Sequence, residues 1–182
     1  MRHLPLNLGA PGAAVLAACL TLTVVRPARS EPEPGYFKLL YRAYGELLAK
    51  DYAAAAADYG RAAKLLPRSI EALLGEQQAL LALGRFADAE PVARAILERD
   101  ADNYLATSRL AWTLFNLKRY KEAADVYTSV LELYPGDLEM MVGLGYSELR
   151  AGRKPAAAVA FRTALAISPK HPRARTGLAQ CR

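Results

Sequence analysis

The residues best suited to catalysis or metal binding are few, and they lie far apart along the chain. The two histidines are His3 and His171, and the two cysteines are Cys19 and Cys181. A catalytic nucleophile needs a base beside it, and a metal ion needs a cluster of ligands. The sequence also has neither a nucleophile-elbow motif nor a phosphate-binding glycine loop. We therefore expect no enzymatic activity, no metal and no cofactor.

Large aromatic side chains offer a different chemistry, because Trp and Tyr supply much of the binding energy at protein interfaces. Trp112 is the only tryptophan, and Tyr146 follows it by 34 residues. Tyr44 precedes Trp112 by twice that distance, and Gln78 lies midway between them. Regular spacing of this kind indicates a repeated structural unit. Each copy of the unit would place one of these side chains at the same position.

The same spacing recurs in small and turn-forming residues. One column holds alanine in every period and another holds proline in three of four: Ala55, Ala89, Ala123 and Ala157, then Pro67, Pro135 and Pro169. Each period contains two helical patterns joined by a short turn, as in residues 103–134. Alanine would let the two helices approach closely, although alanine is also simply a good helix former. Repeats of this length predict stacked helical hairpins.

These features together resemble the tetratricopeptide repeat family. The resemblance implies an all-α fold, a right-handed superhelical solenoid of about four helical hairpins that binds protein partners. The expected repeats span 36–69, 70–103, 104–137 and 138–171, and residues 172–182 would form a capping helix. The second repeat departs most from the pattern, because Ala93 stands where the first, third and fourth repeats have an aromatic residue.

The resemblance also implies where a partner would bind, because the first helices of stacked hairpins line the concave side. The expected groove comprises Phe37, Leu40, Tyr44, Leu47, Gln78, Leu105, Ser108, Arg109, Trp112, Phe115, Asn116, Val142 and Tyr146. This set is rich in aromatic and aliphatic side chains, so it suits an apolar peptide or an amphipathic helix of a partner protein. Aromatic residues at helical spacing are also typical of a core, which residues 31–37 or the capping helix would then cover.

The first 30 residues have the organisation of a secretory signal peptide. A basic start precedes an apolar run from Ala10 to Val25, and residues 28–30 fit a cleavage site. The mature chain would begin at Glu31 with a linker over 31–35. We therefore expect a periplasmic or secreted protein. An uncleaved membrane anchor is one alternative, and a lipoprotein carrying its lipid on Cys19 is another.

Cleavage after residue 30 would leave Cys181 as the only cysteine, so no disulfide could form within the chain. The alternatives for Cys181 are an ordinary terminal residue and a disulfide between two molecules.

Charge is distributed unevenly along the chain. The net charge is +6, yet residues 31–149 contain 13 basic and 18 acidic residues, and residues 150–182 contain eight basic residues and no acidic ones. The basic stretches are not interleaved with aromatic residues, which argues against nucleic-acid binding.

We predict a non-enzymatic adaptor in the cell envelope. The alternative is a structural protein that self-assembles through its acidic body and basic C-terminal end.

Overall fold

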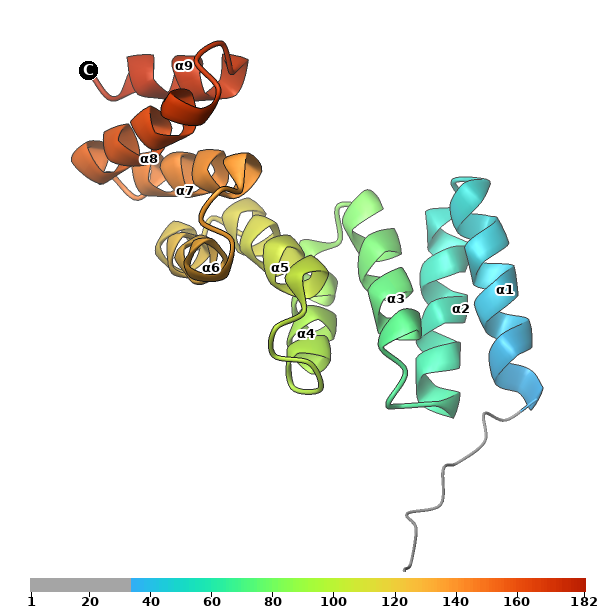
Figure 1. Cartoon of the computed structure of the whole chain (residues 1–182). Coiled ribbons are helices and arrows are strands. Elements are labelled where there is room, and N and C mark those ends of the chain that lie inside the picture. Colours follow the sequence, from blue (N-terminus) through green and yellow to red (C-terminus); the bar gives the residue numbers. More distant parts are fainter. Residues whose placement is uncertain (1–33) are drawn as a thin grey trace, which may run out of the picture. The chain divides into compact units, whose positions relative to one another are not determined.

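The structure is a computed structural model that describes residues 34–182. The predicted signal segment 1–30, Cys19 within it, and residues 31–33 of the predicted linker lie outside the described residues. The described part contains nine α-helices and is all-α, as predicted (Figure 1). They are α1 (Pro34–Leu48), α2 (Tyr52–Leu65), α3 (Ile70–Ala82), α4 (Phe86–Leu97), α5 (Tyr104–Asn116), α6 (Tyr120–Leu133), α7 (Leu138–Arg150), α8 (Lys154–Ile167) and α9 (Pro172–Gln180).

The first eight helices form four hairpins: α1 with α2, α3 with α4, α5 with α6, and α7 with α8. Each helix packs on the next one along the chain, from α1 on α2 through to α8 on α9. Helix α9 also packs on α7, in the place expected of a capping helix. Helix α1 begins at Pro34, so residues 34 and 35 are helical rather than part of the predicted linker. Proline is favourable in the first turn of a helix, because no N–H is required there.

The ends of the helices are set by capping residues and turn residues that recur in each repeat. Helices α3, α5, α7 and α9 each begin after a side-chain cap that accepts a hydrogen bond from a backbone N–H three residues on: Ser69, Asn103, Asp137 and His171. The turn inside each hairpin contains one residue with positive φ, namely Lys50, Gly84, Lys118 and Gly152. Glycine accepts this left-handed conformation at no steric cost, which explains its place in two of the four turns.

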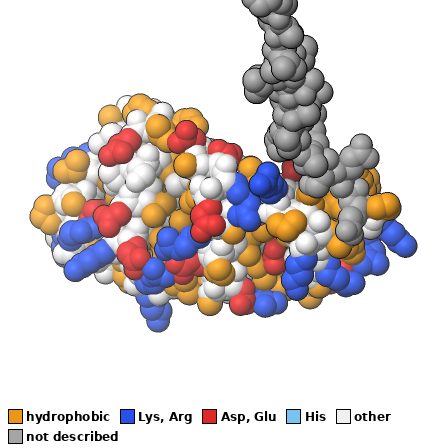
Figure 2. Space-filling model, turned by 90° about the horizontal axis from the view of Figure 1, so that it is seen from below, with side chains coloured by type: hydrophobic (Ala, Val, Ile, Leu, Met, Phe, Trp, Pro, Cys, Tyr) orange, Lys and Arg blue, Asp and Glu red, His pale blue; other side chains and the backbone are white. Residues whose placement is uncertain are grey.

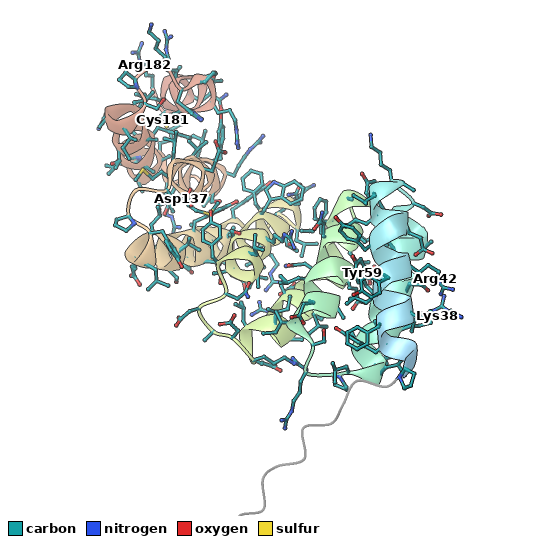
Figure 3. The ribbon with its side chains drawn as sticks, turned by 45° about the vertical axis from the view of Figure 1, so that its right-hand side comes forward. Lys38, Arg42, Tyr59, Asp137, Cys181 and Arg182 are labelled. Atoms are coloured by element: carbon teal, nitrogen blue, oxygen red, sulfur yellow. The ribbon has the colours of Figure 1, made fainter. Side chains whose placement is uncertain are left out.

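The hairpins are held together by small residues placed opposite aromatic rings. The alanine column Ala55, Ala89, Ala123 and Ala157 is completely buried between helices. The rings of Tyr59 (Figure 3), Tyr127 and Phe161 lie against the backbone of the next first helix, where a Cβ atom on Gly75, Gly143 or Gly177 would come within 2.4, 2.5 or 2.2 Å of the ring. The prolines Pro67, Pro135 and Pro169 are exposed, two residues beyond the ends of α2, α6 and α8.

The row of hairpins has an inner and an outer side. Neighbouring first helices approach one another along the whole row: α1 contacts α3, α3 contacts α5, α5 contacts α7, and α7 contacts α9. The second helices α2, α4, α6 and α8 make no such contacts with one another. The first helices therefore line the inner face of the row. The right-handed sense of the superhelix stays a prediction. None of the described helices is long and apolar enough to cross a membrane.

Candidate functional site

A hollow on the inner face lies between the third hairpin, the fourth hairpin and α9. Its volume is about 220 Å³. It is lined by Trp112 and Phe115 of α5, Tyr127 of α6, Gly143 and Tyr146 of α7, and Arg173 of α9. A second depression adjoins it and adds Ser108, Arg109, Glu139 and Met140 to the lining. We call these two depressions together the aromatic hollow.

The floor of the aromatic hollow depends on Gly143. A Cβ atom at this position would lie 2.5 Å from the ring of Tyr127, so only glycine lets that ring lie against the backbone of α7. Tyr127 is 4% exposed, and this burial raises its pKa to about 12. One side of the Tyr127 ring thus packs in the core while another borders the hollow.

Neighbouring aromatic rings fix the walls of the hollow. The Trp112 ring meets the Phe86 ring edge to face with 5.1 Å between centroids, and the Phe115 ring meets that of Tyr120 at 5.3 Å. Trp112 is still 44% exposed, so a large apolar surface faces the solvent. Walls supported in this way present contact area that costs little conformational entropy when a ligand binds.

The capping helix closes one side of the hollow through Tyr146. The Tyr146 hydroxyl donates a hydrogen bond to the carbonyl oxygen of Arg173 at 2.9 Å, and the Arg173 guanidinium lies 5.8 Å from the centre of the Tyr146 ring. Arg173 also forms an ion pair with Glu139 at 2.8 Å. The capping helix therefore covers Tyr146 in part, whereas Trp112 remains open.

Arg109 is the least neutralised charge at the hollow. It donates one hydrogen bond to the Leu74 carbonyl oxygen at 3.1 Å and one to Gln78 Oε1 at 3.2 Å. Among residues 34–182, no carboxylate lies within ion-pair distance of it. Partial burial lowers the pKa of its guanidinium. Arginine remains charged throughout the ordinary pH range, so the lining of the hollow includes a cation that no carboxylate of residues 34–182 neutralises.

The structure distributes the predicted groove residues over two separate areas. Five of them line the aromatic hollow, namely Ser108, Arg109, Trp112, Phe115 and Tyr146. Leu105 is exposed at the start of α5, and Asn116 at its end donates a hydrogen bond to the Trp112 carbonyl oxygen. Phe37, Leu40, Tyr44 and Leu47 lie on α1, two hairpins away, and the exposed Gln78 lies between the two areas on α3.

Placing Val142 in the groove is wrong. Its side chain is completely buried in a core cluster with Phe161 of α8 and Ala174 of α9. The reason is the capping helix, which packs on α7 and removes this flank of the helix from the inner surface.

Five lining residues are absent from the predicted groove: Tyr127, Glu139, Met140, Gly143 and Arg173. Tyr127 falls in the aromatic packing column, so its spacing indicates only a core role. Gly143 and Arg173 carry no pattern of their own. The one available signal is the period, since Gly143 lies 16 residues after Tyr127, the same offset that separates Gly75 from Tyr59.

Charge does not favour association of the two ends of the row. Residues 34–69 contain six basic and three acidic residues, so the N-terminal hairpin is basic like the C-terminal end. The acidic excess lies in the second repeat, where residues 70–103 contain seven acidic and three basic residues. On the face drawn in Figure 2, basic and acidic side chains are interspersed rather than gathered into patches of one sign. Neither end of the row is therefore acidic, so the basic C-terminal end of one copy would find no acidic end on another copy to attract it.

Residues 34–182 contain no cluster of three or more potential metal ligands, and Cys181 is their only cysteine, a free thiol.

Comparisons with known proteins agree with this architecture. Curated relatives match over part of their length only. The chain is 33% identical over 100 residues to the small glutamine-rich tetratricopeptide repeat-containing protein 2 of Mycosarcoma maydis, which covers 55% of this chain and 28% of that protein. It is 26% identical over 121 residues to the CTR9 homologue of Arabidopsis thaliana, covering 66% of this chain and 11% of that protein.

Among solved structures, MamA from Desulfovibrio magneticus RS-1 superposes with a TM-score of 0.78 at 19% identity, covering 83% of this chain and 85% of that one. A tetratricopeptide repeat protein from Parabacteroides merdae gives 0.73 at 19% identity, covering 81% and 59%. These similarities show the fold.

The family is shown by the match of the tetratricopeptide repeat model to residues 74–137 and 139–182, which is more than half of the 182 residues. Members are scaffolds for protein–protein interaction and are typically not enzymes. This chain belongs to the tetratricopeptide repeat family.

Proposed function

We propose that this protein is an exported adaptor that holds an apolar segment of a partner protein in the aromatic hollow. The observation that carries the proposal is the exposed Trp112 ring, set beside Phe115, Tyr127 and Tyr146 in one depression of the inner face. Buried aromatic anchors in pockets of this kind dominate binding energy at protein interfaces. A peptide or one face of an amphipathic helix would place one or two apolar side chains in the hollow.

Export is supported by the sequence alone. The basic start, the apolar run from Ala10 to Val25 and the small residues at 28–30 fit a signal peptide. Mass spectrometry of the N-terminus of the protein made in its own host tests this. A chain beginning at Glu31 supports export, a lipidated Cys19 supports the lipoprotein alternative, and an intact N-terminus contradicts cleavage.

The binding site is tested by photo-cross-linking in the host, with a photoreactive phenylalanine analogue at position 112. The matched control is position 134. Tyr134 is also 44% exposed, and its ring meets that of Tyr104 edge to face at 5.2 Å, much as Trp112 meets Phe86 at 5.1 Å. We expect a discrete cross-linked protein from position 112 and none from position 134. The same adducts from both positions, or none from position 112, would contradict the assignment of the hollow.

Trp112→Ala serves as the loss-of-function variant, with Tyr134→Ala as its control. Trp112 is preferable to Tyr146, because the Tyr146 hydroxyl holds the capping helix and its removal would loosen that helix. We expect Trp112→Ala to lose the cross-linked partner from a second position in the hollow, Ser108, while its helical content stays that of the unmodified protein.

A further inference from the structure

Helix α1 exposes an apolar stripe that the rest of the described chain leaves uncovered. The stripe consists of Phe37, Tyr41, Tyr44 and Leu48, which are 46%, 72%, 56% and 66% exposed. We call these four residues the α1 stripe. Large apolar side chains seldom gather in the open on a soluble domain, and such a patch marks an interaction surface. Helix α1 lies at one end of the row of hairpins, at the opposite end from Cys181 and Arg182 (Figures 1 and 3).

Tyr41 shows that this face differs from that of the other first helices. The equivalent positions in α3, α7 and α9 are Gly75, Gly143 and Gly177, and each receives an aromatic ring from the preceding second helix. On α1 the position carries a tyrosine whose own ring points into the solvent. A side chain of this size would collide with an incoming ring, so the face is not shaped to receive another hairpin of the same kind.

The spacing of the α1 stripe fits a pair of helices. Its members are separated by four, three and four residues, which is the spacing of the seam of a two-helix coiled coil. An antiparallel pair related by a two-fold axis would bring Phe37 against Leu48 of the second copy and Tyr41 against Tyr44 of the second copy. A single surface then serves both copies and closes the assembly at two.

The flanks of the stripe are compatible with this pairing. Lys38 and Gly45 border it on one side, and the antiparallel arrangement places Lys38 beside Gly45 of the second copy rather than beside a like charge. A Cβ atom on Gly45 would have no neighbour within 4 Å, so there is room for close approach. Arg42, labelled in Figure 3, forms ion pairs with Asp58 and Glu46 of its own chain, so its charge is neutralised within that chain.

The area of the stripe sets the strength of the contact. With about 200 Å² for each aromatic side chain, the stripe exposes about 450 Å² per copy. Two copies would bury about 900 Å², below the ~1,200 Å² at which stable interfaces begin. The contact should therefore be weak and depend on concentration.

From these observations we infer that the α1 stripe is a self-association surface, at which two copies of this protein form a weak antiparallel dimer. This surface is separate from the aromatic hollow, so the dimer and the proposed adaptor function can be tested independently.

The test is sedimentation equilibrium of the full chain between about 1 µM and about 500 µM, a range suited to a weak interface. We expect the average mass to rise from that of a monomer toward that of a dimer. Tyr41→Glu should remain monomeric throughout, because it places a charge at the centre of the seam. Tyr134→Glu, a change of the same kind on α6, should associate like the unmodified protein.

Three results would overturn the proposal. A monomer at every concentration excludes the dimer. Association that persists in Tyr41→Glu places the contact in another part of the chain. Binding to phosphatidylethanolamine–phosphatidylglycerol vesicles that Tyr41→Glu abolishes, in a protein that stays monomeric, assigns the stripe to a lipid surface instead. None of these outcomes bears on the aromatic hollow, and Trp112→Ala should dimerise normally.

Discussion

Replacing Ala93 with phenylalanine should destabilise this protein, yet stabilise a variant in which two neighbours have been made smaller. In the other repeats an aromatic ring is seated between two small residues on successive first helices. The ring of Phe161, for example, lies against Gly145 on one side and Gly177 on the other. In the second repeat the ring is missing, and the two corresponding positions hold Gln77 and Arg109.

The structure gives the size of the effect. Gln77 is completely buried, and both polar atoms of its amide lack a hydrogen-bond partner among the described residues, a cost of about 1–3 kcal/mol. Adding a phenylalanine ring beside Gln77 and Arg109 would overfill the site and cost about 1–3 kcal/mol. With Gln77→Ala and Arg109→Gly in place, the ring fits into the space left by the two shortened side chains. Its burial then contributes about 1.5–3 kcal/mol to the free energy of unfolding. The glycine at position 109 costs about 1 kcal/mol of helix stability.

The effect of Ala93→Phe on the free energy of unfolding should therefore change sign between the two backgrounds, with a coupling of about 3 kcal/mol, at the upper end of values for residues in contact. Urea denaturation followed by circular dichroism measures it in four proteins: the unmodified chain, the single variant, the double variant and the triple variant. Ala89→Phe, one turn earlier on the same helix, is the control, because Ala89 is fully buried in the alanine column and should not tolerate a ring in either background. Equal destabilisation by Ala93→Phe in both backgrounds would refute the reasoning.

Two further changes test the packing and the charges. Gly143→Ala should lower the free energy of unfolding by about 1–3 kcal/mol, because the new methyl group would lie 2.5 Å from the Tyr127 ring. Gly45→Ala is the control, because a Cβ atom there would lie in open space, and it should raise the free energy of unfolding by up to about 1 kcal/mol. Urea denaturation measures both. The hydrogen bond from Arg42 lowers the pKa of the buried Asp58 carboxyl in the folded protein. The unfolded chain therefore takes up this proton first as the pH falls, so the stabilisation is complete above about pH 4 and is lost below it. Asp58→Asn should be less stable at pH 7 by about 1–3 kcal/mol, and its melting temperature should approach that of the unmodified protein at low pH.

The fold could be predicted from the sequence because the same local signals occur four times. A single alanine or proline indicates little, but columns such as Ala55, Ala89, Ala123 and Ala157 at one spacing define the hairpin and its borders. Side-chain caps and turn residues recur with the same period, so the helix ends are specified as well.

The site could be predicted only in part, because periodicity assigns a residue to a face of its own helix and not to what covers that face. The residues equivalent to Val142 in the other repeats, Leu40, Leu74 and Ser108, are half-buried, whereas contacts with α8 and α9 bury Val142 completely. Tyr127 belongs to the packing column, and the structure alone reveals that its ring also borders the hollow. Both differences arise from contacts between elements that are distant in the sequence.

The pairing of rings and glycines fails at two positions, and each of them belongs to one of the two proposed surfaces. A regular array places a glycine on each first helix and a ring on the helix before it. Arg109 occupies such a position opposite Ala93, where the ring is missing, and its charge borders the aromatic hollow. Tyr41 occupies another, on the helix that no described hairpin precedes, and it lies at the centre of the α1 stripe. Departures from local consistency tend to occur where function requires them. At both positions a side chain that a regular repeat would not allow is presented to the solvent, and that side chain is available for recognition.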